Sequence, residues 1–159
     1  MIAPALVMHW MLRLDPKAAA SAPDLAEGIA EAASDDRDPI DAASLLVSLA
    51  FHESHFRLDA ISADDDPALA FGAFQISPRW LTLPASASMQ ARIALMLVRD
   101  SQKRCQSLAQ YTSGFCDRGL QAAKARQDLA DRIKRGTYVE PSDPGRRAHC
   151  KPEESELVL

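Results

Sequence analysis

The residue of this chain best placed for chemistry is a glutamate at the end of an apolar helix. Glu53 lies one helical turn after Leu49 and two turns after Leu46, in the stretch Leu49-Ala-Phe-His-Glu-Ser-His-Phe56. Apolar surroundings raise the pKa of a carboxyl group, because burial disfavours its charged form. A carboxylic acid of this kind can protonate the oxygen that links two sugars. The spacing therefore predicts acid–base chemistry at Glu53.

Further motifs follow Glu53 in a recognisable order. They are Asp59-Ala-Ile-Ser62, then Phe71-Gly-Ala-Phe-Gln-Ile-Ser77, and then Leu108-Ala-Gln-Tyr-Thr-Ser-Gly114. This order resembles the lysozyme-like soluble lytic transglycosylases of glycoside hydrolase family 23. That family has a helix ending in Glu-Ser-x-Phe, an Ala-x-Ser element, a Gly-(Leu/Ala)-(Met/Phe)-Gln-(Ile/Leu) motif and an Ala-x-Tyr-Asn-x-Gly motif. The resemblance extends over residues 24–135.

The resemblance implies a role for each matching residue. Glu53 corresponds to the single catalytic acid/base, and Ser54 would support the site or touch sugar. Gly72 would let the backbone approach the sugar closely, and the Gln75 side chain would line the groove. The hydroxyl of Tyr111 is expected near the catalytic carboxyl group.

Two more residues are expected to bind substrate. Ser62 belongs to the Ala-x-Ser element, and Trp80 follows the Gln75 motif closely enough to reach the groove. Trp80 and Trp10 are each either a core residue or a platform on which a sugar stacks. Of the two, Trp80 is the better candidate for the groove.

The chain departs from the family pattern at two places. Thr112 follows Tyr111 where the family has Asn, and Asp64-Asp-Asp66 stands where small residues and Gly are more usual. The variant Thr112-Ser-Gly-Phe-Cys116 resembles phage-borne members. The first departure supports an alternative, a non-catalytic structural virion or wall-binding protein that keeps the lysozyme-like fold.

The family's reaction needs one carboxylate, whereas most glycosidases use two. Glu53 would protonate the leaving oxygen and then accept the proton of the muramic acid 6-hydroxyl as that hydroxyl attacks the anomeric carbon. The expected cut is at the β-1,4 bond between N-acetylmuramic acid and N-acetylglucosamine in peptidoglycan, with a 1,6-anhydro product. Hydrolysis stays open as the second choice, with Asp64, Asp65 or Asp66 holding a water.

The 159 residues, with abundant Ala and few β-branched runs, predict one all-α domain. We expect a lysozyme-like helical domain over 1–139, with a substrate cleft between helices, a short irregular motif loop and an N-terminal extension over 1–22. An irregular tail is expected over 140–159. Within the domain, Leu25, Ile29 and Ala32 or Ala33 should face inward, as should Ile93, Met96 and Leu97. The expected helices cover 24–33, 41–56 with Asp41 as N-cap, 88–103 with Ser88 as a candidate N-cap, 104–111 and 117–135.

Composition and charge exclude several classes of function. The formal net charge of −4 and the absence of a basic stripe argue against nucleic acid as a partner, and no apolar run is long enough to span a membrane. Residues 1–14 make a poor signal peptide and read as part of the fold. We expect a phage virion or tail, through contacts with its proteins, to carry the enzyme to the bacterial periplasm or cell wall.

No cofactor or metal is expected. His52 and His55 are spaced i and i+3, whereas the zinc protease motif needs i and i+4. No Gly-x-Ser-x-Gly elbow of a serine hydrolase occurs. The three cysteines are either free thiols or include a disulfide between Cys105 and Cys116, which would suit an oxidising compartment.

Overall fold

In the part of the chain that the computed structural model describes, residues 1–62, 69–81 and 85–137, the regular secondary structure is helical. These ranges contain two isolated β-bridges and no strand, so the predicted all-α class is confirmed. None of the helices in them holds a stretch long and apolar enough to cross a membrane. The elements are α1 (Pro4–Leu14), the 3-10 helix η1 (Pro16–Ala20), α2 (Ala22–Ser34), α3 (Pro39–Ser54), α4 (Ala87–Cys105), α5 (Ala109–Ser113) and α6 (Leu120–Lys134).

Helix α3 is the central element, and every residue from Ala42 to Ala50 is buried. A helix that is apolar on all sides belongs inside a domain. The helix begins two residues earlier than predicted, because Pro39 fits its first turn and Asp38 caps it by accepting a hydrogen bond from the Asp41 amide. It ends at His55, which adopts a left-handed conformation. This central position places Glu53 in the last turn of a buried helix.

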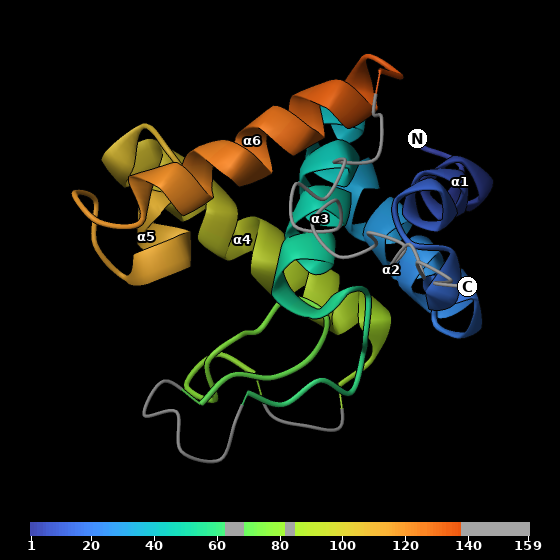
Figure 1. The fold of residues 1–159 in the computed structure, drawn as a ribbon, viewed down its shortest axis with the longest axis horizontal. Coiled ribbons are helices and arrows are strands. Elements are labelled where there is room, and N and C mark those ends of the chain that lie inside the picture. Colours follow the sequence, from blue (N-terminus) through green and yellow to red (C-terminus); the bar gives the residue numbers. More distant parts are fainter. Residues whose placement is uncertain (63–68, 82–84, 138–159) are drawn as a thin grey trace, which may run out of the picture.

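Helix α6 packs along α3 in the opposite direction. Lys134, in its last turn, pairs with Asp38 at the start of α3, with 3.2 Å between Nζ and Oδ2. Midway along, the Ser48 hydroxyl donates to the main-chain carbonyl of Arg126 at 2.6 Å. Figure 1 shows α6 crossing over α3 towards α5. The middle of α6 therefore faces the second half of α3.

The predicted N-terminal extension over 1–22 is itself part of the packed helical core. Val7, Trp10 and Met11 of α1 are buried in the same hydrophobic cluster as α2 and α3. The predicted helix over 24–33 lies within α2, and its expected inward residues are buried: Leu25, Ile29, Ala32 and Ala33. The predicted tail over 140–159 lies outside the described residues.

Helix α4 differs from the prediction in its boundaries and its buried face. Ser86, rather than Ser88, is the N-cap and accepts a hydrogen bond from the Met89 amide. The side chain of Met96, expected inward, is 51% exposed. The buried face instead carries small and medium residues because α2 lies very close: a Cβ on Gly28 would meet the α4 backbone at 2.6 Å. The buried residues of α4 are Gln90, Ala91, Ala94, Leu95, Val98 and Ser101.

The short separate helix predicted over 104–111 is present, but its bounds are shifted to Ala109–Ser113. Helix α4 continues to Cys105, and α5 is a short helix that begins at Ala109. Gln106, in a left-handed conformation, ends α4 and turns the chain. A disulfide joins Cys105 to Cys116, so the segment that carries α5 is closed at both ends.

The described residues between α3 and α4 (55–62, 69–81 and 85–86) form an irregular segment that lies at one end of the molecule (Figure 1). Phe71 forms bridges with both Ile61 and Ile76, which folds the described parts of this segment into a compact turn. The Ser62 hydroxyl accepts a hydrogen bond from the Ala70 amide at 2.9 Å. We call residues 71–76 the motif loop. The Asp64–Asp66 run lies outside the described residues.

Candidate active site

The carboxyl group of Glu53 is sheltered, as its position at the end of a buried helix predicts. Its side chain is 18% exposed. Burial raises its pKa above the ordinary 4.5, and the positive charge and hydrogen bonds of Arg126 partly oppose that rise. The carboxyl group thus combines access to solvent with a surrounding that favours its protonated form.

Arg126 is the direct partner of Glu53, and sequence reasoning missed it. The guanidinium donates from Nε to Oε1 of Glu53 at 2.9 Å, and its Nη2 lies 2.8 Å from the same oxygen as an ion-pair contact. Its Nη1 donates to the carbonyl oxygen of Ala122 one turn earlier in α6, at 3.0 Å. The two residues are 73 positions apart. No local pattern signals a pair that only the packing of α6 on α3 creates.

Ser54 is buried and connects α3 to the motif loop. Its hydroxyl donates to the carbonyl oxygen of Ala73 at 2.9 Å, and it accepts from the Arg57 amide at 3.0 Å. These contacts are structural, and both roles expected for Ser54 at the site stay predictions. The motif loop is therefore fixed directly beside the residue that follows Glu53.

Gly72 is required for a reason that the sequence did not reveal. Its φ is +75°, and a Cβ there would collide with the side-chain amide of Gln90. Gln90 is buried in α4 and accepts from the Ala73 amide at 2.8 Å. Its Nε2 donates to the carbonyl oxygens of Leu58 and Ala85. One amide side chain thus holds three points of the irregular segment, and close packing against it explains the glycine.

Gln75 turns its amide into its own loop. Its Nε2 donates to the carbonyl oxygen of Gly72 at 3.0 Å and to that of Ala60 at 3.4 Å. Gln75 itself has a φ of +46°, which the turn requires. These contacts stabilise the motif loop. That the Gln75 side chain lines a sugar-binding groove stays a prediction.

Tyr111 lies close enough to Glu53 for the carboxylate charge to affect the pKa of its phenol. Burial, and to a lesser extent the negative charge of Glu53, raises the pKa of Tyr111 far above its usual value. Its hydroxyl donates to the carbonyl oxygen of Phe74 at 2.7 Å. The motif that contains Tyr111 therefore meets the motif that contains Gln75 at the motif loop, next to the end of α3.

Thr112, which replaces the expected Asn, and the following Ser113 both form hydrogen bonds within the turn between α5 and α6. Thr112 donates to the carbonyl oxygens of Ala109 and Gly119, and Ser113 donates to that of Arg118. Gly119 closes against the Thr112 hydroxyl, where a Cβ would come within 2.8 Å. These two side chains shape the chain between α5 and α6.

The two tryptophans differ sharply in exposure. Trp10 is buried in the core, whereas the Trp80 side chain is 50% exposed. The Arg79 guanidinium lies 5.6 Å from the Trp80 ring centroid. Trp80 therefore has a free aromatic surface of the kind that stacks on sugars, although contact with substrate stays a prediction.

His52 and His55 point to different surroundings. Burial lowers the pKa of His52, with a smaller contribution from the charge of Arg126. His55 contacts Asp15 instead, with 3.5 Å between Nδ1 and Oδ2. Across residues 1–62, 69–81 and 85–137, no three metal-ligating side chains are grouped to hold an ion.

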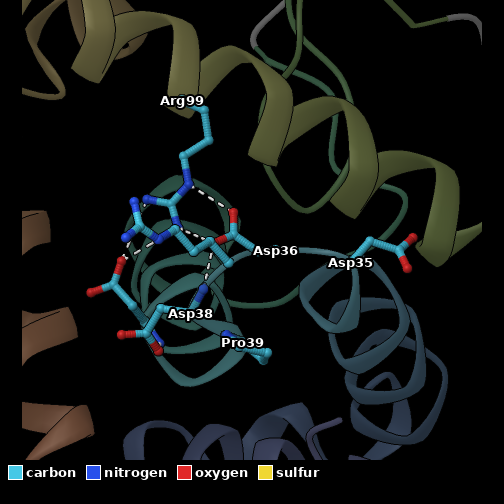
Figure 2. Close-up of a pocket in the computed structure, with 7 residues that line it drawn as sticks. Asp35, Asp36, Asp38, Pro39 and Arg99 are labelled. Atoms are coloured by element: carbon cyan, nitrogen blue, oxygen red, sulfur yellow. Dashed lines mark hydrogen bonds and ion pairs between the residues drawn. The ribbon is translucent and has the colours of Figure 1, made fainter.

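A wide hollow of about 740 Å³ lies at the opposite end of α3 from Glu53. Its lining includes Asp36, Asp38 and Asp41. Figure 2 shows Arg99 reaching into it from α4, and its guanidinium pairs with Asp36 at 2.9 Å and with Asp41 at 3.4 Å. These ion pairs join α4 to the turn before α3 and to the first turn of α3. The hollow is therefore a place where ion pairs connect α4 to the start of α3, and it is distinct from the candidate active site.

A second hollow, of about 360 Å³, lies between the end of α4 and α6, and Glu53 is not among its lining residues. The candidate site is instead a sheltered acid at the junction of α3, the motif loop, α5 and α6. Such a group can exchange a proton with a bound molecule. In comparisons with known proteins, no family model, curated protein or solved structure matches this chain.

Proposed function

We propose that this protein cleaves the β-1,4 bond between N-acetylmuramic acid and N-acetylglucosamine in bacterial peptidoglycan, as a lytic transglycosylase. The observation that carries the proposal is the sheltered carboxyl group of Glu53, whose pKa burial raises. Its neighbours are those that the family resemblance implies, Ser54 and Tyr111, each joined to the motif loop.

The reaction needs only one proton carrier. Protonated Glu53 gives its proton to the glycosidic oxygen as the bond to the anomeric carbon breaks. The resulting carboxylate takes the proton of the muramic acid 6-hydroxyl as that oxygen bonds to the anomeric carbon. The product is a 1,6-anhydro sugar, and Glu53 is protonated again for the next turnover.

A second candidate is a non-catalytic virion or wall-binding protein with the same fold. The observation that favours it is the Glu53–Arg126 ion pair, because a paired carboxylate is a poorer proton donor. Phage particles, as partners or carriers, stay a prediction from the sequence.

The test compares the parent chain with Glu53→Gln on purified peptidoglycan. Glu31→Gln is the matched control, since Glu31 also pairs with an arginine, Arg92, but lies on the surface. We expect Glu53→Gln to lose at least about 100-fold in turnover, the scale of acid–base catalysis, and Glu31→Gln to behave like the parent.

Mass spectrometry of the digest identifies the reaction. Anhydro-muropeptides support transglycosylation, whereas reducing-end muropeptides mean hydrolysis. Retained cleavage by Glu53→Gln would remove Glu53 from its role. A parent chain that cleaves nothing would favour the non-catalytic candidate.

A further inference from the structure

Arg126 contacts only one of the two carboxyl oxygens of Glu53 in the interactions that the described residues make. Both guanidinium contacts go to Oε1, and within the described residues no hydrogen bond is made to Oε2. The Arg126 side chain is 14% exposed, so the pair is sheltered and still reaches solvent. The guanidinium carries five N–H donors, and its contacts with Glu53 and Ala122 involve three of them. A second carboxylate arriving from solvent could therefore meet the remaining donors.

The position of Arg126 is fixed independently of Glu53. Its carbonyl accepts from Ser48 of α3, and its Nη1 donates to Ala122 of its own helix. Neither of these two contacts involves Glu53. An arginine has five donors in a planar fork that suits carboxylates, so it can exchange one carboxylate for another without moving its helix.

The ion pair and the proposed reaction make opposite demands on Glu53. Proton delivery needs the neutral acid, whereas Arg126 stabilises the carboxylate. Burial already favours the neutral form, and Arg126 opposes it. Anything that draws the guanidinium away from Oε1 therefore leaves Glu53 with burial alone and makes it a better acid.

We propose that Arg126 is a positioning and specificity residue that exchanges Glu53 for a carboxylate of the substrate strand, which releases Glu53 to act as the acid. This inference rests on the proposed function. The muramoyl sugar offers such a carboxylate on its lactyl group, or on the stem peptide attached there. Strands that carry a free carboxylate would then activate the enzyme, and neutral strands would not.

Activity on defined strands tests the exchange. The substrates are a muramoyl–glucosaminyl tetrasaccharide with free lactyl carboxylates, the same strand with carboxamides, and the strand with stem peptides. For the parent we expect kcat/KM at least about tenfold higher with free carboxylates than with carboxamides, equivalent to roughly 1.4 kcal/mol. A higher value with the peptide-bearing strand than with the free lactyl strand would identify the peptide as the source.

Three variants separate specificity from structure. Arg126→Gln should lose the preference, with a ratio near one and an alkaline limb of kcat/KM shifted to higher pH. Arg126→Lys should keep part of the preference. Lys124→Gln, which removes an exposed charge of α6 that pairs with Asp128, should match the parent. Equal losses on charged and neutral strands in Arg126→Gln would overturn the exchange and leave Arg126 a structural residue.

A second measurement does not depend on turnover. The Glu53 carboxyl carbon is titrated by NMR, with Glu53→Gln to assign its signal, alone and with N-acetylmuramic acid, its amide or muramoyl dipeptide. We expect the acid or the dipeptide, but not the amide, to raise the pKa of Glu53. An unchanged titration would overturn the exchange even if the enzyme is active. Conversely, an inactive parent that shows this shift would refute the proposed reaction and retain the carboxylate exchange.

Discussion

The phenol of Tyr111 in α5 donates a hydrogen bond to the main-chain carbonyl of Phe74 at 2.7 Å, which ties two motifs 37 residues apart in sequence. Ser54, at the end of α3, donates a hydrogen bond to the neighbouring carbonyl oxygen of Ala73. The motif loop is therefore held from two helices on the side where Glu53 lies. This arrangement, together with the Gln90 contacts, leads to the predictions that follow.

Removing the Tyr111 hydroxyl should loosen the motif loop without abolishing chemistry. Tyr111→Phe deletes one hydrogen bond, which contributes about 1 kcal/mol to the free energy of unfolding. Urea denaturation measures this loss. Turnover should fall by no more than about tenfold, since an effect near 1.4 kcal/mol corresponds to that factor. A loss as large as that of Glu53→Gln would instead place the hydroxyl in the reaction itself.

The space at Gly72 should tolerate no side chain. Gly72→Ala would carry a positive φ and also a collision with the Gln90 amide. Gly136→Ala is the matched control, because Gly136 has a φ of +67° and nothing within 4 Å of its Cβ position. We expect Gly72→Ala to lower the free energy of unfolding by about 1–3 kcal/mol more than the control, the usual cost of overpacking. Equal losses in the two variants would leave backbone strain as the sole cause.

The disulfide should stabilise the segment that carries α5. Cys105 and Cys116 close a loop with a sequence separation of 11, for which chain entropy predicts roughly 3 kcal/mol. The double variant Cys105→Ser/Cys116→Ser should lose about that much in urea denaturation. Dithiothreitol should lower the stability of the parent and leave the variant unchanged. A parent indifferent to the reductant would show that the bond contributes nothing in solution.

The stability contribution of Glu53 should fall as pH rises. Its pKa is raised in the folded chain from an ordinary value of 4.5, so the folded chain holds this proton where the unfolded chain has lost it. The contribution is fully present below about pH 4 and declines as pH rises through the folded pKa. The difference in unfolding free energy between the parent and Glu53→Gln, measured from about pH 4 to about pH 8, should therefore decrease with pH.

The contribution of His52 to stability changes with pH in the opposite direction, and it is present in both the parent and the Glu53→Gln variant. Its pKa is lowered from 6.5, so its stability contribution is lost as pH falls below that value. Comparing the two chains removes most of this contribution. A difference that rises with pH would mean that the ion pair with Arg126 outweighs the effect of burial on Glu53.

Local sequence determined helices α2, α3, α4 and α6 and the placement of Glu53 in the last turn of α3. The apolar run before Glu53 predicts a buried helix whose last turn carries an acid, because its burial follows from a periodicity read over a few turns. Helix ends were less predictable: Asp38 and Ser86 cap α3 and α4, ahead of the residues expected.

Only the tertiary structure decided which side chains surround Glu53. Arg126 reaches it because α6 runs back along α3, and the reason for Gly72 is a glutamine on another helix, Gln90. Neither pairing leaves a trace in local spacing, because each depends on how two distant helices pack. The sequence thus specified the acid, and the packing of α6 and α4 specified its charge environment and the loop beside it.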